Sequence, residues 1–223
     1  MQEFVIIVAG GSGSRMKSDL PKQFLPVGGR PVLMRTIETF RAYSQQLVIR
    51  LVLPESQFDF WRSLCREYNF TADYELVAGG ATRFHSVQNG LGSIDAREGL
   101  VAVHDGVRPF VNDAIISAGF QSAAVNGTAV TCVDLKDSAR VVLPNGTNQA
   151  VNRADYRLIQ TPQTFRLDWM RKAFQTDYLA HFTDCASVLE EAGYPIFLIE
   201  GAYENIKITT PEDLLWAEAF LKK

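Results

Sequence analysis

Apolar runs typical of buried β-strands alternate with segments typical of amphipathic helices along this chain of 223 residues. The first run, at residues 4–9, is continuously apolar, as expected of a strand that is covered on both faces of its sheet. Similar strand signals occur at 47–53, 73–77, 100–104, 128–133 and 195–199. Helix signals stand between or after them, at 31–41, 55–68, 82–91, 112–125, 166–178, 183–192 and from 210 onward. This alternation predicts an α/β fold with a mostly parallel sheet and helices on both of its faces.

One segment, at about 137–155, interrupts this alternation. It contains short β-like runs on either side of Asn145-Gly146, a pair that favours a tight hairpin turn. We interpret it as an antiparallel β-arm that projects from the sheet, and an ordinary surface hairpin is the alternative. The length of the chain favours a single domain over residues 1–223, with this arm as an excursion from it.

The composition argues against several classes of protein. A net charge of −3 is unlike the basic excess of a general nucleic-acid binder. The N-terminal apolar run has no basic residue before it and ends at Gly10, so we expect neither a signal peptide nor a membrane span. Cys65, Cys132 and Cys185 are far apart and odd in number, which fits free thiols in a reducing, cytoplasmic compartment.

A glycine-rich segment follows the first strand directly. In open α/β sheets, ligands bind at the carboxyl ends of strands, and glycines there let backbone N–H groups approach a polyphosphate. The segment is not a P-loop, because no Gly-Lys-Ser/Thr follows, and Met16 stands where a dinucleotide-binding loop has its third glycine. We therefore expect nucleotide binding at its backbone, by Ala9, Gly10, Gly11 and Gly13.

Three basic side chains are candidates for catalysis. Arg15 and Lys22 lie in or just after the glycine-rich segment, where they reach the β- and γ-phosphates of a triphosphate. Lys207 is expected on a late strand, from which it folds back to the centre of the sheet and neutralises the α-phosphate. The alternative for each of them alone is an ordinary solvated charge.

A second glycine-containing loop, at 79–87, leads into a helix. Its backbone at Gly80 and the hydroxyl of Ser86 are candidates for reading a base edge and a ribose. Arg83 is interpreted either as a phosphate ligand or as part of a packing salt bridge. We expect His85 to be structural and not a catalytic base.

Asp105 ends an apolar strand next to the expected phosphate site. A carboxylate in that position suits a magnesium ion, bound directly or through water. Contact with a sugar hydroxyl or capping of a turn are the alternatives. His104 precedes it, but no nucleophilic serine stands nearby, so we expect no catalytic triad.

In their order along the chain, these motifs resemble the bacterial 2-C-methyl-D-erythritol 4-phosphate cytidylyltransferases of non-mevalonate isoprenoid synthesis. The resemblance covers nearly the whole chain and rests on seven blocks: Ala9-Gly10-Gly11-x-Gly13-x-Arg15-Met16, Pro21-Lys22-Gln23, Gly79-Gly80-x-x-Arg83-x-x-Ser86-Val87, His104-Asp105-x-x-Arg108-Pro109, Gln160-Thr161-Pro162-Gln163-x-Phe165, Thr183-Asp184-x-Ala186-Ser187 and Asn205-Ile206-Lys207-x-Thr209-x-Pro211.

The resemblance implies a Rossmann-like α/β fold with an extended β-arm, a homodimer formed through that arm, and CTP and Mg²⁺ as ligands. It implies triphosphate contacts for Arg15 and Lys22 and α-phosphate neutralisation by Lys207. Gly80 and Ser86 would line the cytidine pocket, with Asp105 near the ribose and the metal. The residues implied for the acceptor, methylerythritol phosphate, are Arg108, Arg153, Thr161 and Thr183.

The chain departs from the family pattern at three places. Ala81 replaces the acid that often follows the second glycine pair, so base contacts there must come from the backbone. Gly106-Val107 replaces the usual small residues after His104-Asp105, and Cys185 replaces the acid after Thr183-Asp184. The change to Cys185 bears directly on the acceptor site.

Three other functions compete with this one. Ribitol-5-phosphate cytidylyltransferases look similar, but Ser86-Val87 and Ala186-Ser187 at their spacings favour methylerythritol phosphate. A non-catalytic nucleotide-binding protein on the same fold would not need the three cations, which are all present. A hydride-transferring enzyme is disfavoured by the missing third glycine and by the position of Lys22.

Overall fold

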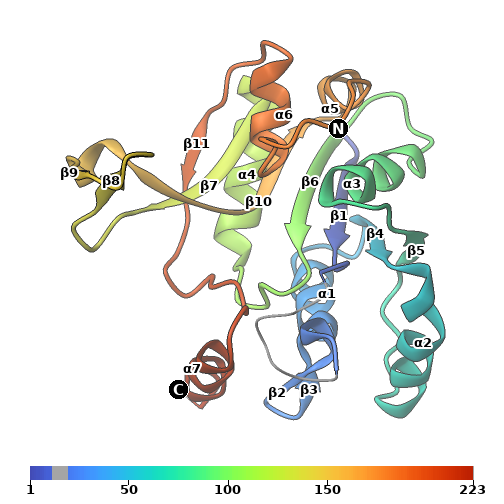
Figure 1. Ribbon diagram of the computed structural model, residues 1–223. Helices are drawn as coiled ribbons and strands as arrows, with labels where there is room; N and C mark the ends of the chain where they lie inside the picture. Colours follow the sequence, from blue (N-terminus) through green and yellow to red (C-terminus); the bar gives the residue numbers. More distant parts are fainter. Residues whose placement is uncertain (12–19, 223) are drawn as a thin grey trace.

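The computed structural model of the protein describes residues 1–11 and 20–222. At its centre is a seven-stranded sheet in the order β11-β7-β10-β6-β1-β4-β5 (Figure 1). The neighbours β5-β4-β1-β6 and β7-β11 pair in parallel, whereas β10 runs antiparallel to both β6 and β7. The strands are β1 (Glu3–Val8), β4 (Val48–Leu53), β5 (Glu75–Ala78), β6 (Leu100–Asp105), β7 (Thr128–Asp134), β10 (Arg157–Arg166) and β11 (Leu198–Glu200).

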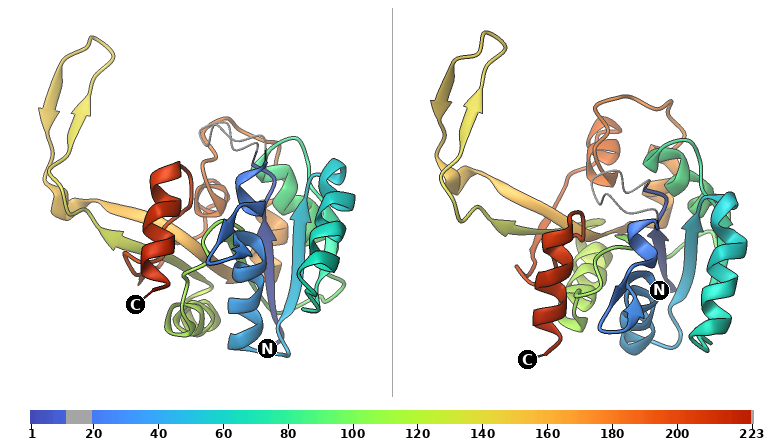
Figure 2. Two further views of the ribbon diagram at one scale, coloured as in Figure 1. Left: turned by 90° about the horizontal axis from the view of Figure 1, so that it is seen from below. Right: turned by 60° about the horizontal axis from the view of Figure 1, so that its bottom comes forward.

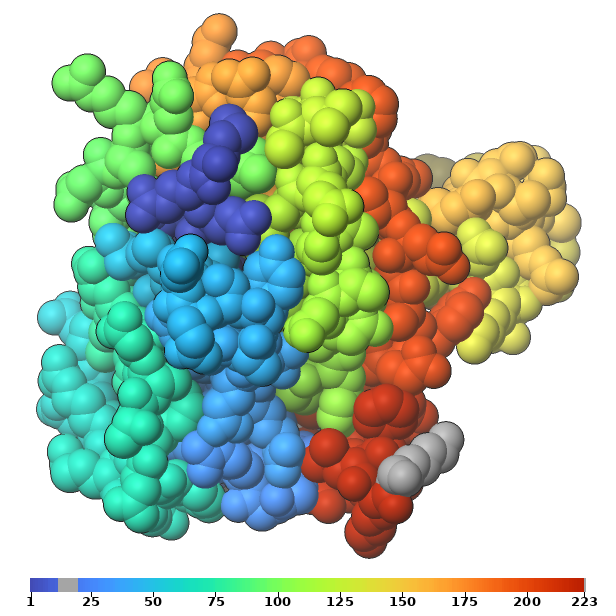
Figure 3. Space-filling view, turned by 180° about the vertical axis from the view of Figure 1, so that it is seen from behind, coloured from blue at the N-terminus to red at the C-terminus, as the bar shows by residue number. Residues whose placement is uncertain are grey.

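Helices cover both faces of this sheet. One apolar core lies under α1 (Val32–Tyr43), α2 (Phe58–Glu67) and α4 (Asp113–Asn126), and Figure 3 shows that face from outside. The other core lies under α3 (Arg83–Gly92), α5 (Leu167–Ala173) and α6 (Cys185–Glu191). The continuous apolar run of β1 follows from this arrangement, because its alternate side chains enter the two different cores. The predicted mostly parallel α/β fold is confirmed.

A third, smaller core attaches the last helix. The helix α7 (Pro211–Phe220) buries Ala217 against Val27 and Ile208, beside the short β2 (Pro26–Val27) and β3 (Arg30–Pro31). Thr210 and Asp213 form a capping box at its start, and the helix signal from residue 210 onward is confirmed. Within the described residues, no helix is both long and apolar enough to cross a lipid bilayer.

The strand β10 was not predicted. Proline is disfavoured inside a sheet because it lacks an N–H group, and this strand contains Pro162. Here the Thr161–Pro162 peptide bond is cis, and the register with β7 shifts between Ile159 and Gln163. The irregularity accommodates the proline, so the strand continues to Arg166. The helix expected at 166–178 is correspondingly shorter and ends at Ala173.

The β-arm is present and projects from the body of the molecule (Figure 2). Its two strands, β8 (Arg140–Val142) and β9 (Asn148–Ala150), form a separate antiparallel hairpin. Gly146 in the turn has φ +81°, a conformation that glycine adopts without strain. The residues of both strands are exposed.

Candidate functional site

A cavity of about 220 Å³ opens where β1 and β6 end, beside the loop that enters α3. The parallel strands bring their carboxyl ends to one edge of the sheet, which is where α/β folds bind ligands. All six of the predicted nucleotide-site residues that the structure describes line this cavity, together with two of the predicted catalytic cations: Ala9, Gly10, Gly11, Gly80, Ser86, Asp105, Lys22 and Lys207. Gly13 and Arg15 lie outside the described residues.

Lys22 stands next to the glycine-rich segment. It begins the short 3-10 helix η2 (Lys22–Phe24), and a Cβ atom added to Gly11 would lie 3.9 Å from its Cε. The neighbouring Gln23 is buried and donates a hydrogen bond of 2.8 Å to the backbone oxygen of Ala9. Gln23 therefore ties the lysine-bearing turn to the end of β1 and fixes both sides of the cavity.

The loop before α3 is closely packed. The backbone N–H of Gly80 donates to Ser86 Oγ at 3.1 Å, so this hydroxyl holds the loop as well as facing the cavity. A side chain at Gly80 would collide with Cβ of His85, which explains the glycine. Thr82 caps α3 and its hydroxyl contacts His85 Nδ1 at 2.9 Å. His85 is thus a structural residue in the free protein, as expected.

Asp105 is the electrostatic centre of the site. Its carboxylate lies 2.9 Å from Lys207 Nζ, 3.5 Å from Arg108 Nε and 3.6 Å from Arg83 Nη2. Burial alone would raise the pKa of Asp105, but the charges of Arg83, Lys207 and Arg108 outweigh it and hold the pKa well below its usual range. The site therefore carries one ionised carboxylate among three cations, a net positive field that suits an anionic ligand.

A chain of hydrogen bonds connects the backbone of Asp105 with Thr161, His104 and the backbone of Arg108. The N–H of Asp105 donates to Thr161 Oγ1 at 3.0 Å, and this hydroxyl lies 3.2 Å from His104 Nδ1. The other ring nitrogen lies 3.0 Å from the carbonyl oxygen of Arg108. A neutral imidazole that accepts from Thr161 and donates to Arg108 satisfies every member of the chain. Complete burial accordingly lowers the pKa of His104 to about 4, although the Arg108 carbonyl and Asp105 oppose this.

Acidification is expected to destabilise the fold through His104. In the unfolded chain this imidazole takes up a proton near its ordinary pKa of 6.5, but in the fold only near pH 4. Stability is therefore lost as the pH falls through this window, by about 2 kcal/mol at pH 5. Urea unfolding at pH 7 and pH 5 would measure the loss. It should shrink in His104→Gln and persist in His181→Gln, an exchange at an exposed position; equal losses in the two variants would contradict this assignment.

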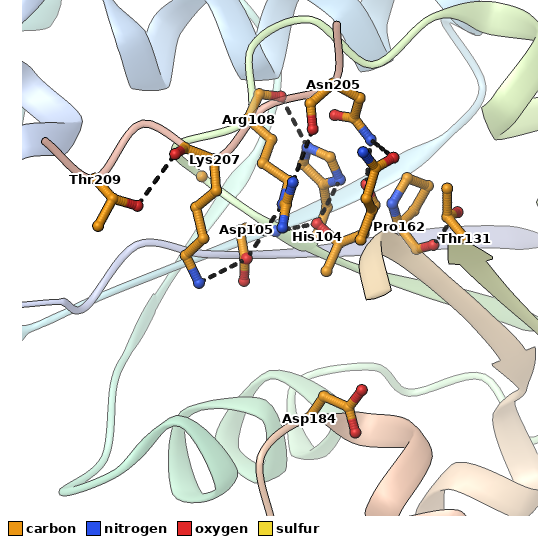
Figure 4. A network of polar contacts seen from close by, with 12 residues as sticks. His104, Asp105, Arg108, Thr131, Pro162, Asp184, Asn205, Lys207 and Thr209 are labelled. Atoms are coloured by element: carbon orange, nitrogen blue, oxygen red, sulfur yellow. Dashed lines mark hydrogen bonds and ion pairs between the residues drawn. The ribbon is translucent and has the colours of Figure 1, made fainter. Parts of the chain in front are cut away.

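The four predicted acceptor residues are not gathered in the cavity. Arg108 and Thr161 are buried behind Asp105. Arg153 is exposed at the base of the arm, where its guanidinium donates to the backbone oxygen of Lys136. Thr183 is exposed just before α6 and is not its cap, because Asp184 caps that helix. Figure 4 shows Asp184 across from Asp105 and Lys207, on the opposite side of the site.

Lys207 lines the cavity but lies in an irregular segment and not on a strand. Residues 205–209 have no regular secondary structure, so the predicted late strand is wrong. The segment is nevertheless held against the loop after β6, since the N–H of Ile208 donates to the Val107 oxygen at 2.9 Å. The expectation that Lys207 folds back to the centre of the sheet is confirmed.

From the sequence, Arg83 was either a phosphate ligand or part of a packing salt bridge, and Gln23 was not predicted as a site residue. Arg83 lines the cavity, pairs with Asp105, and its Nη1 lies 3.4 Å from the buried Cys185 Sγ. It therefore links α3, β6 and α6. A signal for both residues was available in the sequence, because each stands within a motif block that also contains a predicted site residue.

Comparison with known proteins adds to this geometry. The family model of 2-C-methyl-D-erythritol 4-phosphate cytidylyltransferase matches residues 4–223. The chain belongs to this family. The cytidylyltransferase of this name from Bacteroides thetaiotaomicron is 50% identical over 221 residues, which cover 99% of this chain and 100% of that protein. The one from Bacteroides fragilis is 49% identical over 216 residues, 97% of this chain and 98% of that protein.

Solved structures agree with this membership in the cytidylyltransferase family. The crystal structure of 4-diphosphocytidyl-2C-methyl-D-erythritol synthase from Anaerococcus prevotii has a TM-score of 0.85 and 28% identity, and covers 100% of this chain and 96% of that chain. The family resemblance seen in the sequence is thus confirmed, and with it an enzyme of the nucleotidyltransferase class. The comparisons favour methylerythritol phosphate cytidylyltransferase over the ribitol-5-phosphate alternative.

Proposed function

We propose that residues 1–223 act as one nucleotidyltransferase domain that joins CTP and 2-C-methyl-D-erythritol 4-phosphate, in non-mevalonate isoprenoid precursor synthesis. The products are the CDP-linked alcohol and pyrophosphate. The observation that carries the proposal is the meeting of Lys22 and Lys207, from distant parts of the chain, in one cavity beside Gly10 and Gly11. Such a cluster of cations and backbone N–H groups suits a triphosphate.

The proposed reaction is a direct in-line displacement. A phosphate oxygen of the acceptor attacks the α-phosphorus of CTP, the new P–O bond forms, and the bond to the β-phosphate oxygen breaks. The electron pair leaves with pyrophosphate, whose charge Lys22 and Arg15 stabilise, while Lys207 stabilises the α-phosphate. The acceptor phosphate is ionised at neutral pH and needs no general base. The neutral, buried His104 is consistent with this.

The substrates occupy different sides of the cavity in this proposal. Cytidine lies along Gly80 and Ser86, near the start of α3. For the acceptor, Arg153 and Thr183 are exposed and accessible to it. Arg108 contacts the carboxylate of Asp105, and Thr161 accepts a hydrogen bond from the backbone N–H of Asp105. We therefore propose that both act on the acceptor through Asp105.

A magnesium ion is part of the proposal. No group of three or more His, Cys, Asp or Glu side chains that would suit a metal occurs within 1–11 and 20–222. Magnesium usually takes one or two carboxylates and leaves the remaining positions to phosphates and water, so the single carboxylate of Asp105, which faces the cavity, fits it. Because Lys207 occupies that carboxylate at 2.9 Å, contact through water suits the geometry best. When bound, the ion would neutralise charge on the triphosphate.

Pyrophosphate release tests the function. The enzyme, with CTP and Mg²⁺, is given either 2-C-methyl-D-erythritol 4-phosphate or ribitol 5-phosphate, and CTP is then exchanged for the other nucleoside triphosphates. We expect release with CTP and the methylerythritol phosphate. The proposed acceptor would be refuted if ribitol 5-phosphate supported pyrophosphate release and the methylerythritol phosphate did not. It would also be refuted if neither acceptor supported release.

We also propose a homodimer formed through the β-arm. The arm exposes Val141, Val142 and Leu143 to water, and Tyr156, Leu158 and Ile159 extend this apolar surface at its base. Exposed apolar side chains gathered on one projecting element are typical of an interface between subunits. A cytoplasmic location goes with this proposal, since the three cysteines are free thiols.

A charge on the arm should dissociate this dimer. Val142 is 71% exposed, so Val142→Asp is expected to leave the fold of one subunit intact. It should weaken dimerisation at least about tenfold, because a carboxylate would have to be buried in an apolar contact. Sedimentation velocity measures the effect. The control is Val125→Asp, at a valine of 84% exposure on α4, and a dimer equally stable in both variants would exclude the arm as the interface.

A further inference from the structure

The short segment before Lys207 is fixed more tightly than its lack of secondary structure suggests. Asn205 is fully buried, although it lies in an irregular stretch. Its side-chain amide donates to the backbone oxygen of Thr161 at 2.8 Å and to Gln160 Oε1 at 3.2 Å. Gln160 in turn donates to the backbone oxygen of Ala202 at 2.8 Å. The two amides thus attach the segment to β10, at the irregularity around Pro162.

The backbone of Asn205 also takes part in a closed ring of contacts (Figure 4). Its carbonyl oxygen accepts a hydrogen bond of 2.7 Å from Arg108 Nη1. Arg108 Nε lies 3.5 Å from the carboxylate of Asp105, and the same carboxylate oxygen lies 2.9 Å from Lys207 Nζ. Covalent connection through Ile206 closes the ring between Lys207 and Asn205. The position of the ammonium group therefore depends on both the carboxylate and the asparagine.

These two constraints differ in what happens when a nucleotide binds. The side chain of Lys207 is 41% exposed, and its four-carbon stem is flexible. An α-phosphate that attracts Nζ competes directly with Asp105. The constraint from Asn205 acts on the backbone and does not compete, so it persists while the ammonium group changes partner.

We propose that Asn205 is a positioning residue for the transfer reaction, holding the backbone of Lys207 at the distance from which its ammonium group meets the α-phosphate. The inference rests on the role assigned to Lys207 under the proposed function. Its consequence is specific, because the loss of Asn205 should impair the chemical step through Lys207 and leave nucleotide binding by the two glycine loops intact.

The first test is the variant Asn205→Ala in steady-state assays of pyrophosphate release. We expect kcat to fall about ten- to a hundredfold, as for other small displacements of a catalytic group, while KM for CTP changes less than about twofold. Gln160→Met, which removes one of the two acceptors of the Asn205 amide and keeps the volume, should give a smaller decrease in kcat. Thermal denaturation shows whether each variant is folded at the assay temperature.

A double-mutant cycle separates positioning from general damage. If Asn205 acts through Lys207, the exchange Asn205→Ala should cost less than about twofold in a Lys207→Ala background. A purely structural role would cost the same factor in both backgrounds, and that result would overturn the inference. Normal turnover of Lys207→Ala alone would instead refute the role of Lys207 in the proposed function, so the two failures are distinguishable.

The matched control is Asn126→Ala. This asparagine also donates through its side-chain amide, to Ser122 Oγ at 3.2 Å. It ends α4 just before β7 begins, whereas the site lies where β1 and β6 end. We expect unchanged kcat there. Loss of CTP binding in a folded Gln160→Met or Asn205→Ala enzyme would also count against positioning, because the predicted defect lies in turnover alone.

Discussion

Replacing Lys207 by alanine is expected to lower kcat by about a hundredfold or more, with a much smaller rise in KM for CTP. The reason is that a preorganised cation that meets charge developing in the transition state lowers the barrier by a few kcal/mol. Lys207 is suited to this, since it lines the cavity and its Nζ is held 2.9 Å from Asp105 before the nucleotide arrives. Single-turnover assays at saturating CTP measure the chemical step directly.

The control for this variant is Lys172→Ala, at an exposed lysine of α5 outside the cavity. It removes the same charge from the protein and should leave kcat unchanged. Near-normal turnover of Lys207→Ala, or an effect confined to KM, would mean that this lysine binds the nucleotide without assisting the transfer.

Replacing Lys22 by alanine is expected to have an effect of similar size, about a hundredfold or more on kcat, but through the leaving group. Lys22 is only 8% exposed and stands beside Gly11, where a triphosphate would meet the glycine-rich segment. A cation in a partly closed site acts in a lower effective dielectric than in water, so its loss is felt strongly.

Product inhibition distinguishes the two lysines. If Lys22 contacts the leaving pyrophosphate, Lys22→Ala should also weaken inhibition by added pyrophosphate at least about tenfold, whereas Lys207→Ala should change it little. The same loss in both variants would show that the two ammonium groups share one phosphate. An unchanged inhibition constant for pyrophosphate in Lys22→Ala would show that Lys22 does not contact the leaving pyrophosphate.

Much of this molecule could be predicted from local patterns. The runs that became β1, β6 and β7 are mostly apolar, because each is buried on both faces. The general position of the site followed from them, since parallel strands end at one edge. The meeting of Lys22 with Lys207 was also predicted, but from motifs and not from periodicity.

Other features depend on contacts that a local pattern does not contain. The sequence indicated charges at Arg83 and Arg108, yet only the fold makes them, together with Lys207, the three partners of the Asp105 carboxylate. The strand β10 was not predicted, and it contains a proline, a residue that is disfavoured inside a strand unless the register shifts there. At α6 the threonine at 183 and the aspartate at 184 are both good caps, and the structure selects the aspartate.

The insertion of β10 between β6 and β7 has a consequence for the order in which the protein folds during synthesis. The strands β5, β4, β1 and β6 are adjacent and all leave the ribosome early, so that this half of the sheet can assemble at once. β7 emerges next but has no neighbour, because both strands that flank it, β10 and β11, are made later. Until β10 and β11 have been synthesised, both edges of the apolar β7 segment stay unpaired in the nascent chain. Segments of this kind aggregate or bind chaperones.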